Sequence, residues 1–282
     1  ASGTYITSFS GNNFLGTIGI DALADEIVVN ESNNDIGVVS IDGGSTRIFD
    51  HSLSFVSNKN LGSRICYGSL AESLNKSLWL NSLSYSSFGT ATLIDHNTGE
   101  YHNFTIGAWL NSLAYNEENM KFFVGFNHDY LGRGVSVIDA ENNTLITTFN
   151  DLHPVGIYSS GDYAYIGSNN KIHIINANNL NVNTLEPSGN YRVKHFVEDE
   201  ENVYALAYNT SLPSGNKVIA IRKSDHTVIA EVSMHKSAYD ICIDTDRGKI
   251  YVISYQSNNI NIINTNDFSS TDWLFAGQFY PN

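Results

Sequence analysis

Short runs in which apolar and polar residues alternate recur along the whole chain. The stretch Lys249–Asn264, KIYVISYQSNNINIIN, shows two alternating arms on either side of a polar Ser-Asn-Asn turn. Alternation with a period of two places every second side chain on one face of a strand, and a polar turn between two such arms is typical of an antiparallel hairpin. Segments with the apolar period of a helix are absent. The pattern predicts an all-β protein.

Six hairpins of this kind follow one another at intervals of 39 to 51 residues. Each is preceded and followed by one more apolar strand, which makes four strands in every repeat. The second arm mostly ends in Asp or Asn, whose side chains can accept hydrogen bonds from the next backbone amides and start a turn. The residues that open the hairpins are Val28, Trp79, Phe123, Tyr165, Tyr204 and Tyr251. A four-stranded repeat of this length is typical of a β-propeller blade.

We therefore predict one domain over residues 1–282, a propeller of six four-stranded antiparallel blades, with seven blades as the alternative. In each blade the strands are expected to run from the innermost, A, to the outermost, D. Residues 1–16 hold a surplus strand, which either closes the ring with the last blade or pairs with a neighbouring molecule. The blades are expected over residues 17–54, 64–106, 110–150, 154–186, 191–233 and 238–277.

Several repeats resemble a known family. The stretches 249–267 and 133–149 resemble the YVTN-type β-propeller repeat of bacterial and archaeal surface proteins, and so does the stretch from His153, with Pro154 and Gly156 at the entry to its inner strand. The likeness extends over nearly the whole chain and is weaker at 69–87. It implies a propeller that binds, adheres, scaffolds or, in some members, catalyses. The repeat residues are structural, so the resemblance implies no catalytic residue.

The charge balance excludes some classes of binding partner. The chain has 15 Lys and Arg against 29 Asp and Glu, a net charge of −14. This balance argues against nucleic acid and against docking on an anionic membrane, both of which require clustered basic residues. No apolar run of about 18 residues occurs, so we expect no membrane insertion.

Low lysine content and five Asn-X-Ser/Thr sequons indicate a secreted, glycosylated protein, extracellular or at the cell surface. The two cysteines, Cys66 and Cys242, are interpreted as buried thiols, with a disulfide as the alternative. The sequons are those of Asn30, Asn75, Asn103, Asn142 and Asn209.

Strand direction sorts the loops onto two rims. A–B and C–D turns share one rim, and B–C and D–A loops share the other. The A–B turns are acidic; one hypothesis is a calcium site, since calcium takes several oxygen ligands, and the other is a solvated rim that keeps the protein soluble. The acidic residues are Asp21, Asp25, Glu26, Glu72, Glu117, Glu118, Asp162, Glu198, Asp199, Glu200, Glu201, Asp244 and Asp246.

The opposite rim is the expected ligand-binding face. Aromatic side chains in exposed loops can stack on sugar rings or anchor a protein partner, and arginine supplies hydrogen bonds. The alternative is that these rings fold back and cap the spaces between blades. Trp109 is the residue we expect to be exposed. The predicted ligand-binding residues are Tyr85, Trp109, His128, Tyr130, Arg133, His153, Tyr191 and Arg192.

Support for catalysis is small. The nine histidines show no zinc-binding spacing, and neither a Gly-X-Ser-X-Gly nucleophile elbow nor a phosphate-binding glycine loop occurs. We expect a non-enzymatic extracellular propeller that binds a glycan or protein partner, or builds a surface layer or appendage. The alternative is a secreted polysaccharide lyase or hydrolase in which His128, Tyr130, His153 and Tyr191 converge.

Overall fold

The structure is a computed structural model in which almost all described elements are strands. One short 3₁₀ helix, Glu72–Leu74, is the exception among them. Side chains are described from residue 67 onward within the ranges given next, except at residues 254, 259 and 272–274. The described backbone covers residues 4–10, 13–20, 24–30, 35–40, 45–49, 55–60, 65–81, 88–209, 216–234, 238–254 and 259–274. The prediction of an all-β protein is confirmed.

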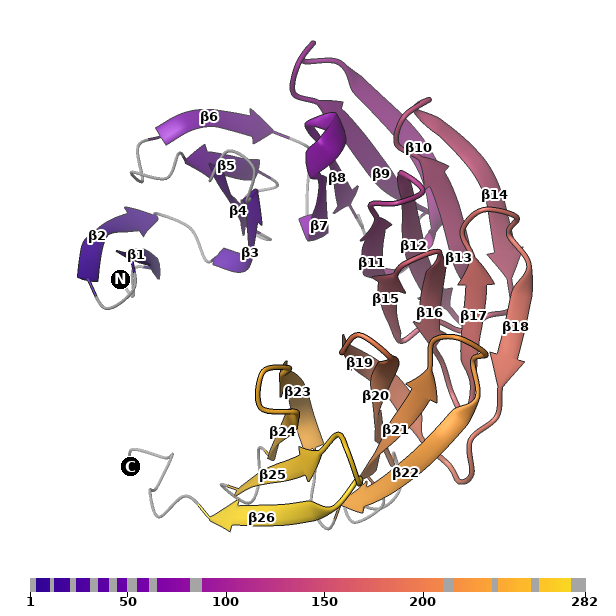
Figure 1. Ribbon diagram of the computed structural model, residues 1–282. Coiled ribbons are helices and arrows are strands. Elements are labelled where there is room, and N and C mark those ends of the chain that lie inside the picture. The colour runs from indigo at the N-terminus through magenta and orange to yellow at the C-terminus, as the bar shows by residue number, and fades with distance from the viewer. Residues whose placement is uncertain are drawn as a thin grey trace. The chain divides into compact units, whose positions relative to one another are not determined.

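Five four-stranded antiparallel sheets follow one another after residue 64, a sixth precedes them, and a two-stranded sheet lies before that one (Figure 1). In every four-stranded sheet the strands pair in chain order. The early strands are β1 (Thr4–Ser10) and β2 (Asn13–Ile20), then β3 (Ala24–Asn30), β4 (Asp35–Ser40), β5 (Ser45–Phe49) and β6 (Phe55–Asn60).

The five later sheets match the blades predicted from residue 64 onward to within a few residues. They consist of β7 (Ile65–Ala71), β8 (Lys76–Asn81), β9 (Phe88–Asp95) and β10 (Tyr101–Ala108); β11 (Leu110–Asn116), β12 (Lys121–His128), β13 (Gly132–Asp139) and β14 (Thr144–Asn150); β15 (Gly156–Ser160), β16 (Tyr163–Gly167), β17 (Ile172–Asn176) and β18 (Val182–Leu185); β19 (Arg192–Glu198), β20 (Asn202–Tyr208), β21 (Asn216–Arg222) and β22 (Val228–Met234); and β23 (Ala238–Asp244), β24 (Lys249–Ser254), β25 (Asn259–Asn264) and β26 (Ser270–Leu274).

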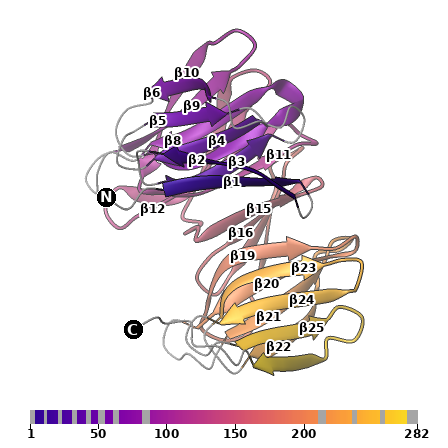
Figure 2. The same ribbon diagram turned by 90° about the vertical axis from the view of Figure 1, so that its left-hand side faces the viewer.

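The predicted start of the first blade is wrong by one strand. The segment expected as its inner strand belongs to β2, which pairs with β1, with Thr7 opposite Thr17 and Ser10 opposite Asn13 (Figure 2). The first four-stranded sheet therefore runs from Ala24 to Asn60 rather than over 17–54. A Gly-Asn pair at residues 11–12 is a turn sequence that favours such a hairpin. Whether β1 also closes a ring or pairs with another molecule stays a prediction.

The chain divides into two compact units. One contains residues 1–154 and 159–162, and the other contains residues 155–158 and 163–282. That the two units form one domain stays a prediction.

In the second unit, strand β20 shows how the sheets pack. Val203 and Ala205 belong to one buried cluster with residues of β16, β17 and β19. Tyr204 and Leu206, which point to the other face, belong to a second cluster with residues of β24 and β25. Both faces of the sheet are therefore buried against other sheets, which is the packing of propeller blades.

Burial also orders the strands within each sheet. The second and third strands are nearly continuous runs of buried residues, whereas the fourth strands, β14, β18 and β22, are mostly exposed. First strands of successive sheets contact one another, as β7 does with β3 and β11, and as β19 does with β23. This order matches the predicted A-to-D arrangement. Tyr165 is buried between sheets as expected, and Tyr251 is half-buried.

The turns between the third and fourth strands share one design. The side chains of Asp95, Asp139, Asn176 and Asn264 accept hydrogen bonds from backbone amides two or three residues later, as predicted from their positions. In each of the five later sheets, the residue four positions after the end of the third strand has a left-handed backbone. This conformation is uncommon for residues other than glycine. The left-handed residues are Gly99, Asn143, Leu180, His226 and Phe268.

Candidate functional site

Four of the eight predicted ligand-binding residues, His128, Tyr130, Arg133 and His153, lie in or next to the two loops that flank strand pair β13–β14. Residues 129–131 connect β12 to β13, and residues 151–155 follow β14. We call Trp109, His128, Asp129, Tyr130, Arg133 and His153 the third-blade rim cluster. All six lie in the first unit.

His128 holds the shape of the first loop. Its Nδ1 atom accepts hydrogen bonds from the backbone N–H groups of Tyr130 and Leu131, both at 3.1 Å. A ring nitrogen that accepts carries no proton, so these bonds require the tautomer protonated on Nε2. The loop therefore presents the next aromatic residue in a defined position: Tyr130 is 92% exposed, and its ring centroid lies 6.1 Å from that of His128.

Arg133 joins the two loops. One guanidinium nitrogen donates to the carboxylate of Asp129, and another lies 2.9 Å from Nδ1 of His153. The Arg133 side chain is about one-third exposed. Because both ends of the planar group have partners, the guanidinium is held in one orientation at the surface.

Trp109 stands at the abrupt connection between β10 and β11. It is 44% exposed, which confirms the predicted exposure, and its backbone has a φ of 57°. Its carbonyl accepts a hydrogen bond from the N–H of Asn127 at 3.1 Å. That bond ties the connection to the end of β12, next to His128.

The second loop is also fixed by its backbone. Asp151 and His153 have φ values of 67° and 50°, and the N–H of Asp151 donates to the Arg133 carbonyl at 2.8 Å. The Asn111 and Asn127 side-chain amides donate to the Pro154 carbonyl at 2.8 and 3.3 Å. A left-handed backbone at residues other than glycine is strained and needs surrounding contacts to hold it. The hydrogen bonds of Asp151 and Pro154 provide such contacts.

Three predicted residues lie outside this cluster. Tyr85 lies outside the described residues. Arg192 is exposed at the start of β19, in the second unit. Tyr191 is 1% exposed, so its prediction as a ligand contact is wrong.

The Tyr191 ring packs into the buried cluster between its own sheet and the preceding one. Its hydroxyl donates to the Pro187 carbonyl at 3.0 Å, and the Lys217 ammonium lies 4.7 Å from the ring centroid. Burial raises the pKa of the Tyr191 hydroxyl, with the Glu231 carboxylate adding to the effect. Tyr191 thus caps the space between sheets, which was the alternative interpretation of these aromatic residues.

Sequence reasoning missed Asp129. Its signal was its place between two predicted ligand-binding residues and four residues before Arg133. Its carboxylate is exposed and pairs with that guanidinium.

The described turns between first and second strands are acidic, as predicted. The residues in or beside these turns are Glu72, Glu117, Glu118, Asp162, Glu198, Asp199, Glu200, Glu201, Asp244 and Asp246. Asp25 and Glu26 are instead within β3 because the first blade begins later, and Asp21 lies outside the described residues. Within the described part of the chain, no group of three or more His, Cys, Asp or Glu side chains is placed to hold a metal ion.

Cys242 is a free, exposed thiol, so its prediction as a buried residue is wrong. It alternates along β23 with Ile241, which faces the packed side and is buried. The side chain of Cys66 lies outside the described residues.

Comparison with solved structures places the chain among β-propellers. No family model and no curated protein matches the sequence. A functionally unknown protein from Desulfotomaculum acetoxidans superposes with a TM-score of 0.67 and 13% identity, over 95% of this chain and 90% of that one. The Myceliophteria thermophila Cps50 (Swd1) β-propeller domain has a TM-score of 0.62 and 12% identity, over 97% and 90%. Sqt1 from Saccharomyces cerevisiae has a TM-score of 0.67 and 9% identity, over 92% and 75%.

Identities this low show the fold alone. The chain thus has a β-propeller fold built from four-stranded antiparallel sheets. Among the described elements, none is a helix with the length and apolar character needed to cross a bilayer.

Proposed function

We propose that this chain is an extracellular, non-enzymatic β-propeller that binds a protein partner through the third-blade rim cluster. The observation that carries the proposal is the exposure of Tyr130 and Trp109, together with the guanidinium of Arg133, which two partners hold in place. Tyr, Trp and Arg are the residue types that dominate the binding energy of protein interfaces. Because the loops are already hydrogen-bonded in place, little conformational entropy is lost on binding.

A protein partner fits this cluster better than a sugar does. Tyr130 projects from its loop with almost all of its surface in solvent, so it can insert into a partner but cannot enclose a ligand. Anchors that enter a partner's pocket are typical of protein recognition, whereas small ligands are bound in concave sites.

We infer that the repeats are of the YVTN type, that the six four-stranded sheets are the blades of the ring, and that β1 contributes to closing it or to assembly with a second copy. The chain order of the sheets and the separate pairing of β1 with β2 support this interpretation.

We also propose that the chain is secreted and glycosylated, and that Asn103 is a better acceptor than Asn75 or Asn142. Its side chain is exposed on outer strand β10, and its carbonyl oxygen accepts from the Thr92 hydroxyl at 2.8 Å, which leaves the amide nitrogen outward. By contrast, the amide nitrogens of Asn75 and Asn142 donate to Asn97 and Asp139. Peptide mapping of protein from its natural source should find added mass on the Asn103 peptide; the bare mass would argue against secretion through a glycosylating pathway.

Site-specific photo-crosslinking tests the binding proposal. Tyr130 in the full chain is replaced by p-benzoylphenylalanine, and the protein is irradiated on intact cells of its natural source. We expect one discrete adduct that excess unlabelled wild-type chain removes and an excess of the Arg133→Ala chain does not. An adduct of two copies would identify the partner as the chain itself.

The matched control places the same crosslinker at Tyr101, an exposed tyrosine at the start of β10, next to the turn between β9 and β10. Identical adducts from both positions, or adducts that resist competition by wild type, would overturn the assignment of the third-blade rim cluster.

A further inference from the structure

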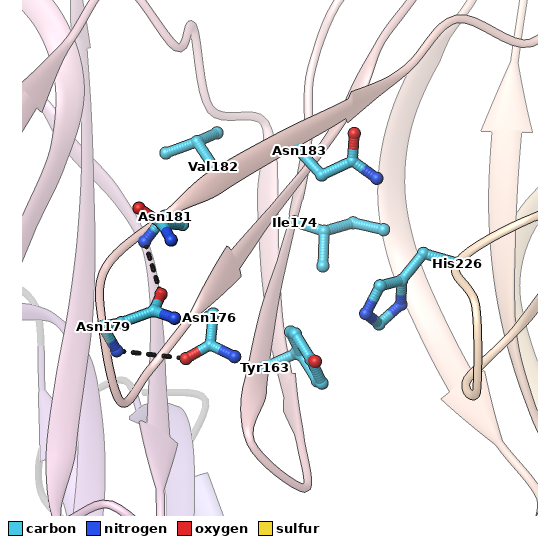
Figure 3. A pocket seen from close by; sticks show the side chains of 8 residues that line it. All are labelled: Tyr163, Ile174, Asn176, Asn179, Asn181, Val182, Asn183 and His226. Carbon is cyan, nitrogen blue, oxygen red and sulfur yellow. Dashed lines mark hydrogen bonds between the residues drawn. The ribbon is translucent and has the colours of Figure 1, made fainter.

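The second unit contains a pocket that no sequence pattern predicted. It has a volume of about 220 Å³ and lies between the outer strands of one sheet and a turn of the next (Figure 3). Strands β16, β17 and β18 supply most of its lining, and the turn between β21 and β22 supplies one side through His226. Within the second unit, it lies at the strand ends joined by the turns between third and fourth strands.

One wall of the pocket is aromatic and held in place. The rings of Tyr163 and His226 meet edge to face, with centroids 4.2 Å apart and an interplanar angle of 73°. His226 has a φ of 56°, and its N–H donates to the Arg222 carbonyl at 2.9 Å. Its Nδ1 lies 3.5 Å from the Tyr165 hydroxyl, so the ring is oriented from inside the sheet packing.

The opposite wall consists of asparagine side chains, and the oxygen atoms of two of them, Asn176 and Asn179, accept hydrogen bonds from the turn. The Asn176 oxygen accepts from the N–H groups of Asn178 and Asn179 at 2.9 and 3.1 Å, and the Asn179 oxygen accepts from the N–H of Asn181 at 2.9 Å. These bonds fix each amide, because its oxygen must face the turn. The amide nitrogens of Asn176 and Asn179, with two N–H groups each, make no hydrogen bond within the described residues.

The lining carries no formal charge. Asp, Glu, Lys and Arg are absent from the residues that line the pocket. Burial lowers the pKa of the His226 ring, against a smaller opposite effect of Asp225, so the ring is neutral at neutral pH. The side chains of Ile174 and Val182 add apolar surface. The pocket therefore offers hydrogen-bond donors and an apolar face to a ligand without net charge.

We propose that this pocket binds one neutral monosaccharide unit, either free or as part of a glycan. A sugar ring has an apolar C–H face, which matches Tyr163, Ile174 and Val182, and hydroxyl oxygens that accept from the amides of Asn176 and Asn179. The volume is below the roughly 300–1,000 Å³ of pockets for drug-sized ligands, which limits the occupant to a single ring. This site is separate from the third-blade rim cluster and does not rest on the proposed protein partner.

Binding of methyl glycosides tests the proposal. Saturation-transfer NMR and calorimetry on the full chain, with the methyl glycosides of glucose, galactose, mannose and N-acetylglucosamine, should reveal millimolar binding of at least one of them. Glucuronic acid and glucosamine, which carry a charge, should bind more weakly. The absence of saturation transfer from every neutral glycoside, or a preference for a charged sugar, would overturn the proposal.

Two variants locate the binding. Val182→Phe fills the pocket from an exposed position and should weaken binding at least about tenfold. Asn181→Ala removes a lining amide whose side chain makes none of the turn's hydrogen bonds, and it should weaken binding to a smaller extent.

Val228→Phe is the matched control. Val228 opens β22 as Val182 opens β18, and the two are 37% and 40% exposed, but only Val182 lines the pocket. Val228→Phe should bind like the wild type. Equal binding by Val182→Phe and wild type, with both folded by circular dichroism, would show that the sugar binds elsewhere and would overturn the assignment.

Discussion

The turn residues show how single side chains specify this fold. Asp139 accepts hydrogen bonds from the backbone N–H and the side-chain amide of Asn142, at 2.8 and 3.0 Å. The same function falls to Asn176 and Asn264 in later sheets, although the residue type changes. An oxygen at that position is what the turn requires, and this requirement was readable from the sequence.

Removing such an oxygen should destabilise the protein measurably. Asp139→Ala loses both hydrogen bonds, and we expect the free energy of unfolding to fall by about 1–2 kcal/mol. Urea denaturation measures this change. Glu141→Ala, in the same turn, is the control: the described contacts of Glu141 use its backbone carbonyl, so its stability should match the wild type. Equal losses from both variants would contradict the turn mechanism.

Two half-buried histidines make stability depend on pH. Burial lowers the pKa of His195, against the raising effect of Asp240, and burial also lowers the pKa of His226, against that of Asp225. A lowered pKa in the folded state means that protonation favours the unfolded state. Their contribution is therefore complete above the unfolded pKa of about 6.5 and is lost as the pH falls through the folded values.

The measurement is urea unfolding at several pH values between neutral and mildly acidic. The stability of the wild type should fall more steeply below about pH 6.5 than that of the double variant His195→Asn, His226→Asn, which lacks both groups. Parallel curves for the two proteins would mean that the burial of these rings does not govern their titration.

Prediction at the residue scale failed where a side chain had a choice of direction. Trp109 and Tyr191 are both large aromatic residues next to a strand start, yet one is exposed and the other buried. The difference comes from Lys217 and the Pro187 carbonyl, which hold the Tyr191 ring inside. Pro187 is only four residues before Tyr191, but Lys217 lies on another strand, β21. Local sequence could not decide between the two directions.

Neighbouring elements are joined by polar contacts as well as by apolar packing. Lys76 in β8 is 7% exposed, and its ammonium donates to the Ala140 and Glu141 carbonyls at 2.7 and 3.2 Å and to the Asn143 side chain at 2.9 Å. These acceptors belong to the turn after β13. A buried ammonium thus joins two successive sheets, and it is satisfied by three oxygen atoms.

Lys76→Met keeps most of the hydrocarbon stem and removes the charge. The buried Ala140 carbonyl would lose its donor and Asp95 would lose an ion pair at 3.9 Å, so we expect a loss of about 2–3 kcal/mol in the free energy of unfolding. Lys171→Met is the control. Lys171 makes a 2.8 Å ion pair with Glu186, but both side chains are about half exposed or more, and such pairs contribute less than about 1 kcal/mol. Equal effects would show that burial of Lys76 does not matter.

Close approach between inner strands depends on one glycine. A Cβ atom on Gly156 of β15 would lie 1.9 Å from the Lys194 carbonyl oxygen of β19. Because that atom belongs to backbone, neither strand can relax without shifting the other. Gly156→Ala should therefore lower the free energy of unfolding by at least about 2 kcal/mol, measured by chemical denaturation.

Gly161→Asn is the control for backbone effects. Gly161 has a φ of 51°, a conformation that Asn tolerates, and a Cβ atom on this residue would have nothing within 4 Å. We expect a change within about 0.5 kcal/mol. A mild effect of Gly156→Ala would mean that the inner strands can move apart at little cost.

For the molecule as a whole, the four-stranded repeat was predictable from the sequence, but the residue at which the first repeat begins was not. From residue 64 onward, four strands recur with the same turn chemistry, so the boundaries were readable to within a few residues. The strand over Asn13–Ile20 alternates like an inner blade strand, but it pairs with β1. Period-2 patterning fixes which residues form a strand, whereas the partner of that strand depends on the turn beside it.

The candidate site was predictable only in part for the same reason. His128, Tyr130, Arg133 and His153 belong to one repeat and were predicted on one rim, and hydrogen bonds join them in pairs. Tyr191, which the lyase alternative expected to converge with three of them, is buried elsewhere. The pocket of the second unit is lined by side chains from three strands of one sheet, by the turn between two of these strands, and by His226 of the next sheet. The shape of such a pocket depends on how the two sheets pack, and the spacing of residues in the sequence does not predict this packing.

Whether the third-blade rim cluster binds a protein partner is best tested by amide hydrogen exchange of the full chain, with and without the partner identified by crosslinking. We expect slower exchange on binding in residues 127–133 and 151–154, and unchanged exchange in residues 177–183 beside the pocket of the second unit. Protection confined to other segments, with residues 127–133 unaffected, would contradict this proposal.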